Sequence, residues 1–65
     1  MIKTAIRFRN NMVMVFDKCG EQIPEYQGQY KKVKKCVLAD ALPDTVLALG
    51  FTDAGELREV SREKW

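Results

Sequence analysis

The N-terminal part of the chain carries the pattern that most constrains its fold. Apolar or β-branched residues recur at every second position over residues 2–8, and a second, almost wholly apolar segment occupies residues 12–17. A period of two residues is typical of a strand with one face in the core. Asn10 and Asn11 lie between the two segments, and asparagine tolerates the left-handed backbone conformation that hairpin loops need. The pattern therefore predicts an antiparallel β-hairpin.

The length of the hairpin loop decides which side chains share a face of the sheet. A two-residue loop pairs Phe8 with Val13, whereas a three-residue loop pairs Phe8 with Met12. The longer loop also places Lys3 opposite Asp17, and opposite charges across a strand pair stabilise it by about 0.2–1 kcal/mol. It also lets three large side chains, rather than two valines, face the core, which favours it by roughly 1–3 kcal/mol. We therefore favour the three-residue loop.

One amphipathic helix is predicted over residues 27–40. Its apolar stripe consists of Tyr26, Tyr30, Val33, Val37 and Ala41. This spacing places the side chains on one continuous face, which a helix needs in order to pack on a sheet. Gly28 weakens the first turn by about 1 kcal/mol relative to alanine, so a helix that starts just after Gly28 is the alternative, and Pro43 ends the element.

The C-terminal third of the chain is predicted to form a second hairpin. Residues 45–51 are rich in valine and leucine, residues 52–55 have the composition of a turn, and residues 56–61 can return as a strand. Alternatively, Asp53 and Glu56 form the capping box of a C-terminal helix. We favour the strand, because the apolar residues that follow fit a helical stripe poorly.

These elements predict an α+β fold in one domain, residues 1–65. Its two layers are an antiparallel four-stranded sheet, in the order hairpin, helix, hairpin (ββαββ), and one helix packed on one face. A single helix covers only one side of such a sheet, so the other side stays open. With the favoured loop, this open face carries small and β-branched residues, which are the candidate protein interface: Ala5, Val13, Val15, Val46 and Ala48.

The short length of the chain favours a partner for this face. A chain of 65 residues buries only about 60% of the surface that its unfolded form exposes. Apolar burial and lost conformational entropy then nearly cancel. We therefore expect a homo-oligomer or a protein partner on the open face, and we infer no small-molecule substrate.

The charges are unevenly distributed, although the formal net charge is only +2. Residues 1–35 hold eight basic and three acidic side chains, whereas residues 36–65 hold three basic and six acidic ones. An uncompensated basic helix face suits the phosphates of nucleic acid, which is the alternative function. Its candidate residues are Lys31, Lys32 and Lys35. Two points oppose it: acidic residues of the C-terminal hairpin can neutralise the lysines, and Lys3 and Arg7 are expected on the opposite sheet face.

The sequence indicates no catalytic, cofactor or metal site. It contains no histidine, which is the commonest general base and metal ligand among side chains. Cys19 and Cys36 lack the spacing of a zinc or redox motif, so we expect free thiols and keep a reactive thiol as a distant alternative. No apolar run approaches the ~20 residues that span a bilayer. We expect a cytoplasmic, non-enzymatic module that does not bind a membrane.

Overall fold

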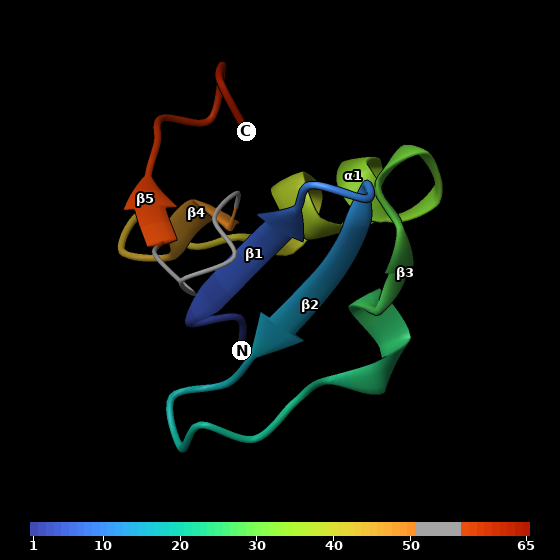
Figure 1. The fold of residues 1–65 in the computed structure, drawn as a ribbon. Helices are drawn as coiled ribbons and strands as arrows, with labels where there is room; N and C mark the ends of the chain where they lie inside the picture. The colour runs from blue at the N-terminus through green and yellow to red at the C-terminus, as the bar shows by residue number, and fades with distance from the viewer. Residues whose placement is uncertain (51–56) are drawn as a thin grey trace.

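The computed structural model describes residues 1–50 and 57–65 (Figure 1). Its elements in chain order are β1 (Thr4–Phe8), β2 (Met12–Phe16), the 3-10 helix η1 (Pro24–Tyr26), β3 (Gly28–Gln29), α1 (Tyr30–Asp40), β4 (Val46–Gly50) and β5 (Leu57–Glu59). The described strands form one five-stranded sheet in the order β3-β2-β1-β4-β5. Since α1 packs on one face of this sheet, the predicted α+β class is confirmed.

The sheet is mixed, which corrects the prediction of an antiparallel four-stranded sheet. β1 pairs antiparallel with β2, but on its other side it pairs parallel with β4. The chain passes through α1 between β2 and β4, and a crossover of this kind can return a strand in the parallel direction. β3 adds a two-residue strand at the β2 edge. Local sequence patterns indicate that strands exist, but they do not fix the order of the strands.

The N-terminal hairpin has the predicted register. Thr4 lies opposite Phe16, and Ile6 lies opposite Met14, as the three-residue loop requires. Asn11 has a φ of 64°, which is the left-handed conformation that asparagine adopts more readily than most residues.

The helix packs on the opposite face of the sheet from the one predicted. Ala5, Val13 and Val15 are 0% exposed and belong to one core cluster with Val33 and Val37 of α1. The prediction that these small residues lie on the uncovered face is therefore wrong. Small side chains on the sheet let α1 approach closely, so this face did not need the larger residues of β1 and β2.

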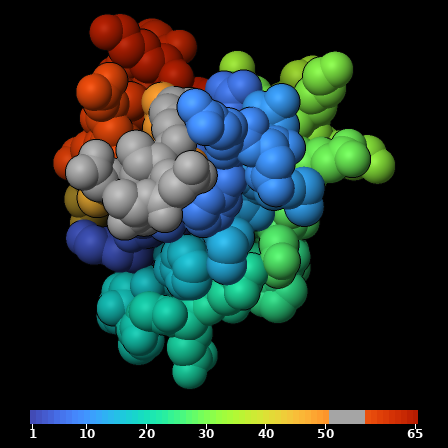
Figure 2. All heavy atoms as spheres, viewed as in Figure 1, coloured from blue at the N-terminus to red at the C-terminus, as the bar shows by residue number. Residues whose placement is uncertain are grey.

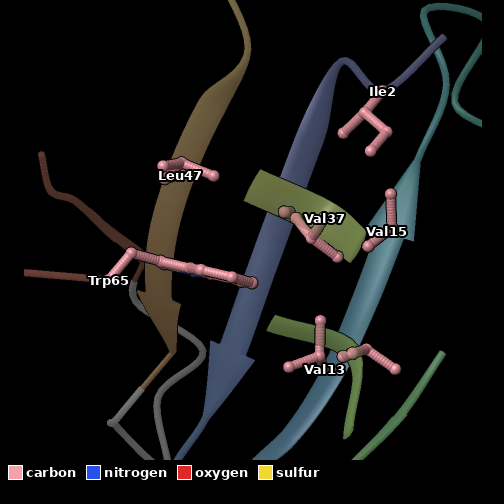
Figure 3. Packing of buried hydrophobic residues seen from close by; sticks show 8 residues of the cluster. Ile2, Val13, Val15, Val37, Leu47 and Trp65 are labelled. Atoms are coloured by element: carbon pink, nitrogen blue, oxygen red, sulfur yellow. The ribbon is translucent and has the colours of Figure 1, made fainter. Parts of the chain in front are cut away.

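Trp65 supplies the volume that the small residues leave. Its side chain is 1% exposed and lies across β4 towards β1, beside Leu47 and Val37 (Figure 3). The indole Nε1 donates a hydrogen bond to the carbonyl oxygen of Ala48 at 2.9 Å. The ring meets Tyr30 edge to face, with centroids 5.5 Å apart. A buried tryptophan with its N–H satisfied is a large apolar contribution, and it completes the core from the C-terminal side.

The predicted bounds of the elements agree in part with the structure. α1 begins at Tyr30, which agrees with the alternative start after Gly28 rather than with a start at residue 27. Gly28 belongs to β3 and has a φ of 142°, a conformation that side chains other than glycine's rarely allow. In the predicted strand over residues 56–61, β5 forms at Leu57–Glu59, which confirms the strand there. The predicted turn over residues 52–55 and the capping box lie outside the described residues.

Candidate functional site

The face of the sheet opposite α1 is the first candidate surface. Successive side chains of a strand alternate between faces, so this face carries the residues that alternate with the core. On β1 and β2 these are Thr4, Ile6, Phe8, Met12, Met14 and Phe16. On the other strands they are Val46, Ala48, Gly50, Leu57, Glu59 and Gln29. We call these residues the sheet face.

Among the described positions of the sheet face, Glu59 is the only charged residue. Met12 exposes 37% and Leu57 55% of its surface, whereas Ile6 and Ala48 at the centre are buried. The described elements α1 and η1, together with Trp65, pack on the other side of the sheet. The sheet face is thus an almost uncharged apolar surface with its most exposed side chains towards its two edges.

Phe8 illustrates how this surface is built. It pairs with Gly50 of β4, and a Cβ atom placed on Gly50 would lie 3.1 Å from the Phe8 ring. That distance is too short for an ordinary contact, so the ring packs directly on glycine backbone. A glycine in a strand often marks such a close approach.

Two of the five predicted interface residues lie on this surface. Val46 is partly exposed and Ala48 is buried, while the other three are in the core under α1. The residues that the prediction missed are the larger ones, Met12, Met14 and Phe16, which had been assigned to the core. A signal for them was present, because β2 is apolar at every position, and continuous apolar runs are typical of strands covered on both faces.

The outer side of α1 is the second candidate surface. Lys31, Lys32 and Lys35 are exposed there, where the sequence placed them. Lys34 is half-buried, and its Nζ lies 5.2 Å from the centroid of the Tyr30 ring. No ion pair links these lysines to an acidic group within residues 1–50 and 57–65. In Figure 2 the side chains of the first turns of α1, in yellow-green, project from the body of the molecule.

The structure adds Arg7 to this second surface. Arg7 lies opposite Val13 and therefore points to the helix side, which corrects its predicted position on the uncovered face. Its guanidinium carbon lies 3.7 Å from the centroid of the Tyr30 ring, a cation–π contact. Arg7 also donates hydrogen bonds to the side-chain oxygen of Asn11 and to the main-chain oxygen of Trp65. The Tyr30 ring thus has two cationic neighbours, Arg7 and Lys34. We call Arg7 and the four lysines of α1 the basic surface.

Comparison with known proteins gives no family. No protein-family model, curated protein or solved structure matches the chain.

Metal-binding groups and reactive side chains were the next candidates among the described residues. These residues contain no cluster of three or more histidine, cysteine, aspartate or glutamate side chains that could hold a metal ion. Cys19 and Cys36 are free and exposed. The hydroxyl of Tyr26 donates a hydrogen bond to Asp40, and this bond raises the pKa of Tyr26, so its phenol is held in the protonated form. Within the described ranges, no helix is long and apolar enough to cross a membrane.

Two shallow hollows adjoin the surfaces. One lies between the β1–β2 turn and the start of α1, with Asn10, Gln29 and Lys31 among its lining residues. The other lies at Met1 and Leu42 and includes the exposed Lys3 and Lys18. Among the lining residues of these two hollows there is no cysteine or serine that could act as a nucleophile.

Proposed function

We propose that the protein is a small non-enzymatic binding module that pairs with a second copy of itself through the sheet face. The observation that carries this proposal is the composition of β2, in which all five residues, Met12–Phe16, are apolar. Val13 and Val15 are covered by α1, but the alternating residues Met12, Met14 and Phe16 face away from it.

The physical argument compares this surface with an ordinary solvated one. A sheet that meets water on one face normally alternates apolar and polar residues. Exposed apolar surface is unfavourable by about 25 cal/mol per Å² compared with buried surface. Methionine and aromatic residues are also enriched at protein interfaces, where the flexible methionine adapts to its partner. These properties support protein binding at the sheet face.

A second copy is the partner that this composition fits best. A surface whose one described charge, Glu59, lies at the β5 edge can meet its own copy without placing a charge in the centre of the interface. In a two-fold dimer the same patch serves both subunits. Strands of about 17 Å at a spacing of about 4.8 Å give a face of roughly 300 Å², of which the central residues Ile6 and Ala48 are already buried. Because standard interfaces bury about 800 Å² per partner, we expect a weak dimer.

The test is a matched pair of substitutions, Met12→Lys and Leu42→Lys. The two side chains have the same exposed fraction, 37%, but only Met12 lies on the sheet face. Sedimentation equilibrium from about 1 µM to about 1 mM should show the wild-type mass rising from 7.5 kDa towards the dimer. Met12→Lys should weaken the dimer about tenfold, and Leu42→Lys should leave it unchanged. A monomeric wild type at every concentration, or equal effects of the two variants, would refute the proposal.

A further inference from the structure

We propose that the basic surface is a second, independent binding site, which takes the phosphate backbone of nucleic acid without reading its sequence. The site faces away from the sheet face, so it does not depend on pairing of the sheets. Lys31, Lys32 and Lys35 are the exposed contacts, and Arg7 and Lys34 add positive potential beside them.

The lysines are placed where they destabilise the free helix. The first turn of α1 contains no acidic residue, and its N-cap Gln29 makes no side-chain capping bond. A helix N-terminus carries a partial positive charge, which repels Lys31 and Lys32. Lys31 and Lys35 also form a like-charge pair one turn apart, which is unfavourable. Bound phosphates would relieve both repulsions, whereas solvent alone relieves them only by screening.

Two of the acidic residues that could neutralise these charges lie away from the exposed lysines. The acidic residue of α1, Asp40, lies at the far end of the helix and accepts the hydrogen bond of Tyr26. Glu59 of the C-terminal hairpin lies on the sheet face, on the other side of the molecule. A concentrated positive potential therefore remains at this end of a chain whose net charge is only +2.

The chemistry of α1 favours nucleic acid over an anionic membrane. A helix that lies on a membrane inserts apolar side chains into the interface, but the apolar side of α1, with Val33 and Val37, is already buried against the sheet. Besides its lysines, the outer side exposes Cys36 and Ala39, which are small. The lysines therefore have no apolar anchor beside them and act through charge alone.

The same residues indicate that the bases are not read. Arginine, lysine, asparagine and glutamine can all read base edges. Arg7, the one arginine of the basic surface, is held by the Tyr30 ring, Asn11 and Trp65, and the exposed lysines are flexible point charges without a fixed donor geometry. The Tyr30 ring contacts Arg7 and Lys34 and packs against Trp65, so it is not free to stack on a base. What remains is attraction to phosphates, which depends strongly on salt and hardly on sequence.

Fluorescence anisotropy with a labelled DNA duplex and its single strand tests this site. With about three phosphate contacts, the log of the affinity should fall with the log of salt concentration with a slope of about −2.7, so binding weakens roughly 40-fold between about 50 and 200 mM. Duplexes of different sequence should bind alike. The double variant Lys31→Gln, Lys35→Gln should reduce the slope by about 1.8.

The matched control changes the same charge elsewhere. Lys3→Gln with Lys18→Gln removes two exposed lysines that lie at the other hollow, beside Met1 and Leu42. This control should bind nearly as the wild type does, and thermal unfolding of both variants checks that they fold. If the α1 variant fails to fold, the single variant Lys32→Gln takes its place. No duplex binding at low salt, equal losses in the two double variants, or binding only to vesicles rich in phosphatidylserine would overturn the proposal.

Discussion

The sheet face and the basic surface lie on opposite sides of the molecule and differ in nearly every property. The sheet face is apolar, and Glu59 is its one charge among the described residues. The basic surface is formed by cationic side chains around Tyr30, and its exposed members are lysines. Both are built on the same core, because α1 contributes its valines to one side of that core and β2 contributes Val13 and Val15 to the other.

The difference between the two surfaces shows how strongly water restricts the residue types that each can carry. The outer side of a helix in water accepts almost any polar residue, so folding does not require lysine there. The lysines mainly determine the charge of this surface. Large apolar residues on a sheet are unfavourable in water unless something covers them. The two surfaces therefore predict opposite responses to salt: sheet-face pairing should change little or strengthen, and phosphate binding should weaken.

The largest difference between the two faces is expected when one negative charge is placed on each side of β2. Val15→Glu buries an unpaired carboxylate under α1, where Val15 is 0% exposed, and should destabilise the fold by at least about 4 kcal/mol. Met14→Glu, one residue earlier, lies on the sheet face and should cost about 1 kcal/mol or less. Urea unfolding followed by circular dichroism measures both. Similar losses of stability in the two variants would mean that α1 does not cover one face of β2 and leave the other uncovered.

Removing Trp65 tests the core that joins the two surfaces. Trp65→Ala should destabilise the fold by about 3–5 kcal/mol, because it leaves a cavity beside Leu47 and breaks the hydrogen bond to Ala48. In so small a domain this loss should abolish cooperative thermal unfolding. Trp65→Phe keeps an aromatic ring without the N–H donor and should lose less. A Trp65→Ala variant with an unchanged melting temperature would contradict the structure described above.

The smallest effect should have the opposite sign. Lys31→Glu places an acidic residue in the first turn of α1 and removes the like-charge pair with Lys35, so it should stabilise the fold by about 0.5–1 kcal/mol. The same change should weaken binding to DNA. Thermal unfolding at low salt, beside Lys18→Glu as the control, measures the first effect. A destabilised Lys31→Glu variant would show that Lys31 has a structural partner.

The sequence predicted what depends on neighbouring residues. The hairpin register followed in part from the pairing of Lys3 with Asp17, whereas the other reason, that the large side chains face the helix, was wrong. The helix followed from the spacing of its valines. The parallel pairing of β1 with β4 could not be predicted in this way, because the two strands are far apart in the sequence and local patterns do not show which strands pair. Local patterns also did not predict which face of the sheet α1 covers.

The face of the sheet that α1 covers depends on Trp65, which lies in none of the favoured predicted elements. Trp65 crosses β4 and packs in the same core cluster as Leu47 (Figure 3), so the small residues Ala5 and Val15 suffice on the helix side. Had the core lacked a tryptophan, the larger side chains of the hairpin would have been needed there. For the same reason the candidate interface was only partly predicted, whereas the exposed lysines of α1, which do not depend on long-range packing, were placed correctly.

The burial of Trp65 also sets the order of events during synthesis of the protein. Many domains begin to fold while the ribosome is still extending the chain. Here the side chain that completes the core belongs to residue 65, so any shorter nascent chain lacks the ring that packs in one cluster with Leu47 and Val37. Stable folding must therefore follow synthesis of this segment, and until then Leu47 and Val37 stay accessible to chaperones and to other nascent chains.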